Sequence, residues 1–244
     1  MVSFKAALMY DSSPNEDMPI HSKEIVPLRE RALKPMATTC VHIVRKANIS
    51  EELSAITEPL IKEYARRIGA DVNVIGATRA FPDYPSTYER MQIYASGRAY
   101  EWNICVDTDI LLGSSLIDAT TVVPPQFVGL IMSYKASDVF PVENHYFRRD
   151  GRDMVPVESF VVTSQWTHDL WEPLRGSSMS NMALVFHEHQ IAEYALAHNI
   201  AKYGLKYAGA FPGGSQIARV SADQERGVSE VQAAHAILRQ WGCS

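Results

Sequence analysis

The sequence predicts an α/β protein in which helices flank a mixed, mainly parallel central sheet. Two observations carry this prediction. Short apolar segments rich in β-branched residues alternate along the chain with segments whose apolar residues recur at helical spacing, and that alternation is typical of β-α-β units. The chain has 244 residues, of which 46% are hydrophobic and 21% charged, so it is long enough to bury a sizeable core.

The first β-α-β unit follows an irregular, proline-containing lead-in. The apolar, β-branched segment "TTCVHIVRK" at residues 38–46 predicts a buried strand. In the following "EELSAITEPLIKEYARRIGA", apolar residues recur at helical spacing. Ser50 is placed to cap this helix and Gly69 to end it, while Pro59 is expected to kink or interrupt it. A second short strand is expected at residues 71–76, "DVNVIG".

A second helix and a third strand complete the series. The segment "STYERMQIYASG" begins with Ser86 and Glu89, which have the spacing of a capping box, and ends at Gly97, where a C-cap glycine belongs. The segment "NICVDTDILL" then predicts a strand that carries Asp107 and Asp109 to its carboxyl end. In open α/β sheets, that edge is where ligands bind.

The second half of the chain predicts further strands and helices. Strands are expected in "QFVGLIMSY" and "ESFVVTS", with a long charged loop at residues 135–156 between them. A short helical piece, "DLWEPL", follows, and then a longer helix from about Glu188 to Gly204. The C-terminal segment "GVSEVQAAHAILRQW" predicts a helix with one apolar face that packs against the body. That face consists of Val228, Val231, Ala234, Leu238 and Trp241.

Composition excludes several classes of function. A formal net charge of -5 argues against a general nucleic-acid-binding protein, because such proteins normally carry a basic surplus. No apolar segment reaches the ~18 to 20 residues of a membrane helix, and the beginning of the chain lacks a signal pattern. The three cysteines show no metal-binding spacing, so we expect reduced thiols and a cytoplasmic protein.

The aspartate pair is the strongest candidate for chemistry. In an extended segment, side chains two residues apart point the same way. Two adjacent carboxylates repel each other unless a cation lies between them. Carboxylate oxygens suit a hard ion such as Mg²⁺ or Mn²⁺ that is bound jointly with substrate phosphates. A structural role stays open, because Asp commonly ends strands by capping the following turn.

The segment "YERMQIYASGRAYEWNICVDTDILLG" resembles the core of GT-A-fold nucleotide-sugar glycosyltransferases, especially the glycogenin-like and lipopolysaccharide-galactosyltransferase-like groups. Those proteins have a helix with a basic residue, a tyrosine-containing turn, and an apolar strand ending in D-x-D. More loosely, "VESFVVTSQWTHDLWEPL" and "FHEHQIAEYAL" are similar to the family's second-half strand and acceptor-facing helix. The resemblance covers roughly residues 38–210, over which the element order agrees. It implies a Rossmann-like GT-A fold, a single domain of two abutting halves.

The resemblance also implies a division of the chain. The expected parts are an irregular lead-in (1–37), a nucleotide-sugar-binding half that ends in D-x-D (38–123), an acceptor-side half (124–220) and a C-terminal helix (221–244).

The implied activity is metal-dependent transfer of a sugar from a nucleotide-diphosphate sugar, most commonly a UDP-sugar, to a carbohydrate or other hydroxyl acceptor. Asp109 would bind Mn²⁺ or Mg²⁺ directly. Asp107 would contact the ribose, the donor sugar or the metal through water. Arg90 matches the family's basic helix residue and would contact the diphosphate. Arg45 and Lys46, at the end of the first strand, would line the nucleotide pocket, although solvated charges are an alternative interpretation.

Two residues of the second half complete the expected site. Glu188 would act as the general base in an inverting reaction, or would bind the acceptor in a retaining one; a helix-dipole role is the alternative. His189 would be a third metal ligand, as a late histidine is in several such transferases. His187 and His189 diverge too far on a helix for both to bind one ion. The chain lacks the C-terminal H-x-x-G-x-x-K-type motif of the glycogenin-like group.

Two other functions remain as alternatives. A haloacid-dehalogenase-like phosphatase would use Asp107 as nucleophile and Asp109 as general acid. However, the residues after that motif are usually x-T/V-L/V, whereas this chain has Ile110, Leu111 and Leu112, so the Thr or Val is missing. The phosphatase motif also normally opens the first strand of the domain rather than the third. A non-catalytic GT-A-like protein that binds a sugar nucleotide is the other alternative. A nucleotidyltransferase is disfavoured, because no glycine-rich, basic phosphate loop follows the first strand.

Overall fold

The computed structural model describes residues 38–130, 155, 157, 159–174, 191–208, 216–221 and 227–242. The described residues all belong to one compact unit, residues 35–244. The expected lead-in and nearly all of the charged loop at 135–156 lie outside the described residues. In the described part of the chain, no helix has the length and apolar character needed to cross a membrane.

The first β-α-β unit is confirmed. Strand β1 (Thr39–Val44) pairs in parallel with β2 (Asp71–Ile75), and α1 (Glu51–Arg67) connects them. The Ser50 hydroxyl accepts a hydrogen bond from the backbone N–H of Leu53 at 3.1 Å, which caps α1 as expected. Gly69 ends the turn after α1 with a φ of +69°, a conformation that other residues rarely adopt.

Helix α1 runs through Pro59 as one helix of 17 residues, so the interruption that the sequence predicted there is wrong. Proline removes one backbone hydrogen bond. The apolar side of α1 carries fully buried Leu53 and Ile61, on either side of Pro59. Burial of that face by tertiary packing stabilises the continuous helix against the local loss.

The second predicted helix is mostly a 3₁₀ segment. It comprises η1 (Ser86–Gln92), a single α-helical turn α2 (Ile93–Ser96) and η2 (Gly97–Ala99). The expected capping box is wrong, because both of its side chains bind elsewhere. The Ser86 hydroxyl accepts from the backbone N–H of Ala47 at 2.9 Å, and Glu89 accepts from the loop before η1.

Gly97 is the C-cap residue of α2, as the sequence predicted, and its backbone N–H donates to the Ile93 carbonyl. Its φ of -84° is an ordinary right-handed value. A Cβ at this position would lie 2.4 Å from Asn103 Oδ1, so the residue is needed for close packing. Asn103, in turn, donates to the Gly97 carbonyl at 3.1 Å.

The predicted third strand divides into two. Strand β3 (Trp102–Asp107) ends at the first aspartate, and β4 (Ile110–Leu112) follows after a two-residue turn. Strand β4 pairs antiparallel with β8 (Ile217–Arg219) in a separate two-stranded sheet. The chain therefore leaves the main sheet at the aspartates, which places them at a junction between two sheets.

The main sheet has six strands in the order β2-β1-β3-β6-β5-β7. Its second half uses β5 (Phe127–Leu130), β6 (Phe160–Ser164) and β7 (Lys206–Ala208). Strand β6 is antiparallel to both of its neighbours, while the other three pairings are parallel. The predicted fold class, an α/β protein with a mixed and mainly parallel sheet, is confirmed. The two expected halves share this one sheet across the β3–β6 pairing.

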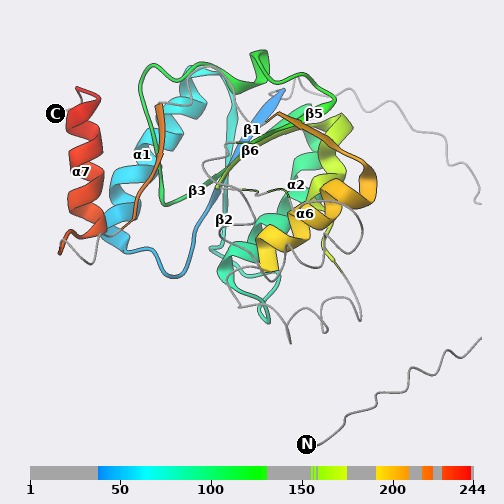
Figure 1. Cartoon of the computed structure of the whole chain (residues 1–244), viewed down its shortest axis with the longest axis horizontal. Coiled ribbons are helices and arrows are strands. Elements are labelled where there is room, and N and C mark those ends of the chain that lie inside the picture. Colours follow the sequence, from blue (N-terminus) through cyan, green and yellow to red (C-terminus); the bar gives the residue numbers. More distant parts are fainter. Residues whose placement is uncertain are drawn as a thin grey trace, which may run out of the picture. The chain divides into compact units, whose positions relative to one another are not determined.

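Helices cover both faces of the sheet (Figure 1). On one face α1 packs on side chains that include Ile43, Ile104 and Val162. The other face is covered by η1, α2, the 3₁₀ segment η4 (Gln165–Trp171) and α6 (Ile191–Tyr203). The predicted "DLWEPL" and Glu188–Gly204 helices correspond to η4 and α6, although residues 188–190 lie outside the described residues. A short 3₁₀ turn, η3 (Ala119–Thr121), precedes β5.

The C-terminal helix α7 (Glu230–Gln240) lies beside α1 (Figure 1). Its expected apolar face is confirmed for three of five residues, while Val228 and Val231 are half-buried outside the cluster. Ala234 is fully buried against Leu53, Leu111 and Val220. Leu238 and Trp241 pack against the same cluster. This cluster joins α1, α7 and the small β4–β8 sheet.

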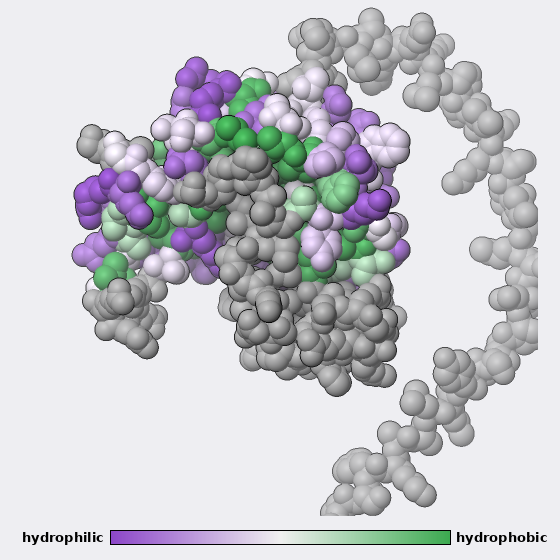
Figure 2. Space-filling view, turned by 45° about the horizontal axis from the view of Figure 1, so that its top comes forward, coloured by the Kyte–Doolittle hydropathy of each residue, from purple (hydrophilic) through white to green (hydrophobic). Residues whose placement is uncertain are grey.

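Figure 2 shows hydrophilic and hydrophobic residues interspersed on the visible face of the described surface, with hydrophilic residues gathered toward its outer edges. Four large apolar side chains are exposed among the described residues: Val72, Ile117, Trp166 and Tyr207. Scattered single residues of this kind are usual on globular proteins.

Candidate functional site

The aspartates lie at the carboxyl end of the third strand, as the sequence predicted. Asp107 is the last residue of β3, and its backbone N–H donates to the backbone carbonyl of Ser159 at 2.9 Å. The next backbone N–H, of Thr108, donates to Val44 of β1 at 3.1 Å. The Asp109 carbonyl accepts from Val220, next to β8, at 2.8 Å. Three other segments therefore fix the backbone of this turn.

Lys46 lies between the two carboxylates. Its Nζ is 2.8 Å from Asp107 Oδ2 and 2.9 Å from Asp109 Oδ2, and it donates to Ser159 Oγ at 3.3 Å. Both carboxylates therefore point the same way, as the spacing predicted. Only 8% of Lys46 is exposed, so the alternative interpretation of a solvated charge is wrong for this residue.

Arg90, on η1, also contacts the Asp107 carboxylate. Its Nη2 donates to Asp107 Oδ2 at 2.8 Å, and its Nε donates to the Thr87 carbonyl at 3.0 Å. Alternation along β3 explains the contact: Cys105 lies on the sheet face that η1 covers, and Asp107 is two residues further along the same face. Arg90 is fully buried, so a buried guanidinium and a buried carboxylate form one unit.

A third cation, which sequence reasoning missed, contacts Asp109. Arg219 Nε donates to Asp109 Oδ2 at 3.1 Å, and 53% of the arginine side chain is exposed. The β4–β8 register, which places Arg219 opposite Ile110, brings the arginine to the site. No local motif marks Arg219, because the contact spans a sequence separation of 110 residues.

Arg45 lies apart from this group. It forms two hydrogen bonds with Glu58 of α1, at 2.7 and 3.0 Å. That contact lowers the pKa of Glu58 through the arginine hydrogen bond, which outweighs the opposing effect of burial. The sequence predicted Arg45 beside Lys46 at the nucleotide pocket; the structure brings only Lys46 to the aspartates.

Charge complementarity decides the protonation states at the site. Burial alone would raise the pKa of Asp107, but Arg90 and Lys46 together outweigh burial and hold that pKa below its usual range. Burial alone would lower the pKa of Lys46, and the two aspartates reverse that effect and leave it raised. Asp107 is therefore an anion and Lys46 a cation at neutral pH.

Glu193, in the first turn of α6, is a second residue that sequence reasoning missed. Burial raises its pKa, against the opposing charge of Arg90. Its Oε2 is buried without a hydrogen-bond partner among the described residues. The sequence pointed instead to Glu188 and His189, which lie outside the described residues. Helical spacing alone cannot distinguish which acid near the start of this helix faces the sheet.

A polar cavity of about 350 Å³ opens beside the aspartates. It is lined by Lys46, Ala47, Asn48, Pro85, Ser86, Thr87, Asp109, Glu193 and Arg219. Residues of the loop after β1, the start of η1, the β3–β4 turn, α6 and β8 thus meet around one space. Both signs of charge line it, so the cavity suits a ligand that carries anionic groups together with a cation.

The aspartates retain groups that suit a divalent ion. Asp107 Oδ1 and Asp109 Oδ1 are buried and have no hydrogen-bond partner among the described residues. Buried carboxylate oxygens are normally satisfied, and hard oxygens of this kind are preferred by Mg²⁺ and Mn²⁺. The described residues contain no group of three or more His, Cys, Asp or Glu side chains arranged around a metal position. The two aspartates therefore fit an ion that takes its remaining ligands from water or phosphate oxygens.

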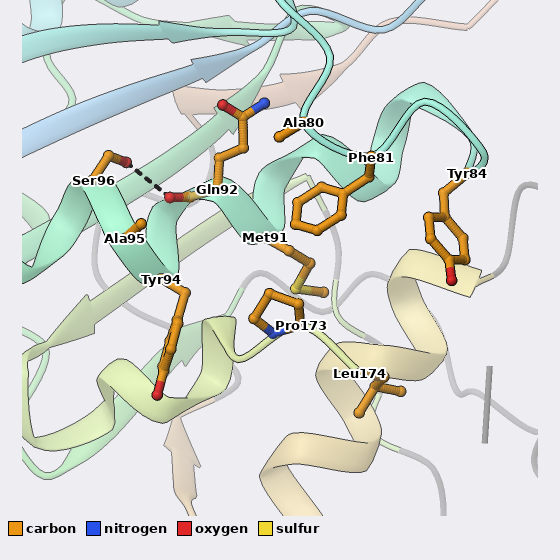
Figure 3. A pocket seen from close by; sticks show the side chains of 10 residues that line it. All are labelled: Ala80, Phe81, Tyr84, Met91, Gln92, Tyr94, Ala95, Ser96, Pro173 and Leu174. Carbon is orange, nitrogen blue, oxygen red and sulfur yellow. Dashed lines mark hydrogen bonds between the residues drawn. The ribbon is translucent and has the colours of Figure 1, made fainter. Parts of the chain in front are cut away.

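A larger apolar cavity of about 800 Å³ lies on the other side of η1. Figure 3 shows Phe81, Met91 and Pro173 gathered around it, with Tyr94 and Leu174 also on its wall. Thr87 lines the polar cavity and Met91 the apolar one, so η1 contributes to both. The apolar cavity holds no charged lining residue among those described.

No protein-family model matches the chain, and no curated protein sequence does. Among solved structures, a glycosyltransferase involved in glycosylation of the major capsid of PBCV-1 matches with a TM-score of 0.45 and 12% identity, over 82% of this chain and 99% of that one. Galactosyltransferase LgtC, with donor and acceptor sugar analogs, matches with a TM-score of 0.43 and 11% identity, over 84% and 95%.

A Drosophila β1,4-galactosyltransferase 7 mutant, in complex with manganese, UDP-Gal and xylobiose, matches with a TM-score of 0.41 and 11% identity, over 78% of this chain and 73% of that one. All three of these solved structures are glycosyltransferases.

Proposed function

We propose that the protein transfers a sugar from a nucleotide-diphosphate sugar to an acceptor hydroxyl, with a divalent metal ion at Asp107 and Asp109. The observation that carries this proposal is the grouping of charges at the polar cavity. Two carboxylates with unpartnered oxygens lie beside the cationic side chains of Lys46 and Arg219. A diphosphate needs both a metal ion that its oxygens share with carboxylates and positive side chains around it.

Each residue of the group has a distinct proposed role. Asp109 and Asp107 would hold Mn²⁺ or Mg²⁺, which when bound stabilises the negative charge that develops on the leaving diphosphate. Arg219, half exposed at the cavity, is placed to contact the donor phosphates. Arg90 does not line the cavity, and its guanidinium is bound to Asp107 and to the Thr87 carbonyl. It keeps Asp107 ionised and oriented, so we propose a positioning role for it in place of the predicted donor contact.

Glu193 is the described residue best suited to accept a proton from the acceptor. It lines the same cavity, and its raised pKa makes its carboxylate a stronger base than an ordinary glutamate. Glu188 stays a prediction for that role in an inverting reaction. A Glu193→Gln variant is expected to keep donor binding and lose turnover; equal loss of both would assign Glu193 to donor binding instead.

Calorimetric titration with UDP, GDP and dTDP, each with and without Mn²⁺, tests the donor site. We expect one nucleotide, a uridine one if the donor is a UDP-sugar, to bind only when Mn²⁺ is present. Asp109→Ala is expected to remove the Mn²⁺-dependent part of the affinity. The proposal fails if no nucleoside diphosphate binds, or if Asp109→Ala binds equally well.

The phosphatase alternative requires Asp107 to attack phosphorus. In the structure one oxygen of Asp107 is bound by both Arg90 and Lys46. Those contacts stabilise the charge that a nucleophile must give up. Hydrolysis of an aryl phosphate that is abolished by Asp107→Asn would nevertheless favour the phosphatase, and we expect none.

We propose a cytoplasmic location from the cysteines. Cys40 and Cys105 are both free and buried, and burial, the largest influence on each, raises the pKa of both thiols to about 12. Thiols of this kind are inert packing groups, which is the usual state of cysteine in a reducing compartment.

A further inference from the structure

Lys46 occupies a position of the kind that a metal ion takes between paired carboxylates. Its ammonium group has three N–H donors, and three oxygens surround it: Asp107 Oδ2 at 2.8 Å, Asp109 Oδ2 at 2.9 Å and Ser159 Oγ at 3.3 Å. An ammonium group is thus bound by both aspartates at once. It relieves the repulsion between two carboxylates that are 0% and 3% exposed.

Cations already outnumber the two carboxylates that they contact, and Glu193 is the one further acidic residue among the described residues that line the cavity. Three cations contact the two carboxylates: Lys46, Arg90 and Arg219. Adding a divalent ion to such a group would place like charges within a few ångströms of each other in a buried setting, which is unfavourable. Movement of one of the three cations away from the aspartates would relieve this repulsion when the ion binds.

Lys46 is the cation whose movement would best relieve the repulsion between the metal ion and the side-chain cations. Arg90 is enclosed and is also held by the Thr87 carbonyl, and Arg219 contacts the outer aspartate from the exposed side. Lys46 contacts both metal-binding residues through the same ammonium group, on a side chain with four rotatable bonds. The side chain already lines the 350 Å³ cavity, so rotation about these bonds provides a path into that space.

We propose that Lys46 stands in for the metal ion in the metal-free protein, that a metal ion displaces its ammonium group from the aspartates, and that the released ammonium lies in the cavity where the donor diphosphate binds. This inference rests on the proposed function and extends it to the order of events. Metal and donor then bind with positive coupling, because the metal releases a positive group to the donor phosphates.

Titration of the metal-free protein with Mn²⁺ alone tests the displacement. Lys46→Met removes the competing charge and keeps an apolar stem of similar length. We expect it to bind Mn²⁺ about tenfold more tightly than the unsubstituted protein, a coupling of ordinary size. Lys46→Arg, which keeps the charge, and Lys202→Met, at an exposed lysine that pairs with Glu172, are the matched controls and should show no gain. Equal or weaker Mn²⁺ binding by Lys46→Met overturns the inference.

Thermal unfolding gives a second measure of Mn²⁺ binding, which applies even if Lys46→Met is less stable without metal. The variant leaves two buried carboxylates without their shared cation, so its melting temperature should fall in metal-free buffer. Mn²⁺ should then raise the melting temperature of Lys46→Met more than that of the unsubstituted protein, because an ion that binds the folded state more tightly stabilises it more. A smaller or equal rise counts against displacement.

Acylation of lysines, measured by peptide mass spectrometry, tests directly whether the Lys46 ammonium group becomes accessible. Lys46 is 8% exposed and should react slowly in metal-free protein. Saturating Mn²⁺ should increase its modification, while that of the exposed Lys202 stays constant. If Mn²⁺ binds and Lys46 stays protected, the ion enters without displacing it and the inference is wrong. If Mn²⁺ binds neither protein, the inference and the proposed metal site both fail. If Mn²⁺ binds and supports UDP binding but Lys46→Met shows no gain, the inference alone fails.

Discussion

Asp107 and Asp109 form ion pairs with three cationic side chains that differ in their exposure to solvent. Arg90 is enclosed and binds Asp107 alone, Lys46 joins the two aspartates, and Arg219 reaches Asp109 from the exposed side. The innermost pair fixes geometry, because neither partner can find water if the other is removed. The outer two cations lie at the cavity, where a ligand can contact them.

At the residue scale we predict that Arg90→Met lowers the free energy of unfolding by about 3–5 kcal/mol, because Asp107 is left as a buried charge with one fewer partner. Arg66→Met is the matched control: its side chain is 75% exposed and pairs with Glu63 within α1, so it should cost less than about 1 kcal/mol. Urea denaturation of both variants measures the difference. Similar losses from the two substitutions would show that Arg90 and Asp107 are not a coupled buried pair.

At the element scale, the first three parallel strands are joined by a polar network inside the sheet. His42 of β1 lies with Nε2 at 2.8 Å from Asn103 Oδ1 of β3, and with Nδ1 at 3.1 Å from Asn73 Nδ2 of β2. The amide oxygen requires the ring proton on Nε2, and Nδ1 then accepts from Asn73. Both ring nitrogens of a neutral His42 are satisfied, so protonation would break one of these contacts.

This network predicts a stability that depends on pH. Burial lowers the pKa of His42 to about 4, below the value of an unfolded histidine. The unfolded state therefore binds the proton first as pH falls, and stability is complete above about 6.5 and is lost between about 6.5 and 4. We expect the free energy of unfolding to drop by about 2 kcal/mol more between pH 7 and pH 4.5 in the unsubstituted protein than in His42→Gln.

Urea denaturation at the two pH values provides the comparison, and the difference between the proteins isolates His42 from other groups that titrate. Parallel losses of stability in both proteins would show that His42 does not titrate in the folded state as its burial implies.

At the scale of the whole molecule, the site depends on a small sheet and a helix at the edge of the main sheet. Strand β8 brings Arg219 to Asp109. Ala234 of α7 packs in one cluster with Leu53 of α1, Leu111 of β4 and Val220, which follows β8. The C-terminal helix thus supports the segment that delivers one cation of the site. Disrupting that packing should therefore weaken ligand binding at the polar cavity and lower the free energy of unfolding.

Ala234→Asp tests this support. Ala234 is fully buried in the cluster, whereas Ala236, on the same helix, is exposed. Burying a carboxylate without a partner should lower the free energy of unfolding by about 2–4 kcal/mol or detach α7. Ala236→Asp should change it by less than about 0.5 kcal/mol. Thermal unfolding measures both, and equal melting temperatures would show that α7 does not depend on this contact.

Those parts of the fold that depend on local sequence patterns could be predicted from the sequence. Buried strands β1 and β3, the cap of α1 at Ser50 and the position of Asp107 follow from periodicity and capping chemistry. The 3₁₀ form of η1 did not, because Ser86 and Glu89 bind distant backbone groups in place of capping. Arg219 and Glu193 were missed for the same physical reason: long-range register and helix orientation, which a single sequence does not contain, bring them to the aspartates.

Release of nucleoside diphosphate from a panel of nucleotide sugars, with water as a substitute acceptor, tests the central claim most directly. The assay compares the unsubstituted protein with Asp109→Asn, with Mn²⁺ and with a chelator. The account predicts release from at least one donor that requires Mn²⁺ and falls at least about 100-fold in Asp109→Asn. Release that is unchanged by the chelator and by Asp109→Asn would contradict a metal-diphosphate site at Asp107 and Asp109.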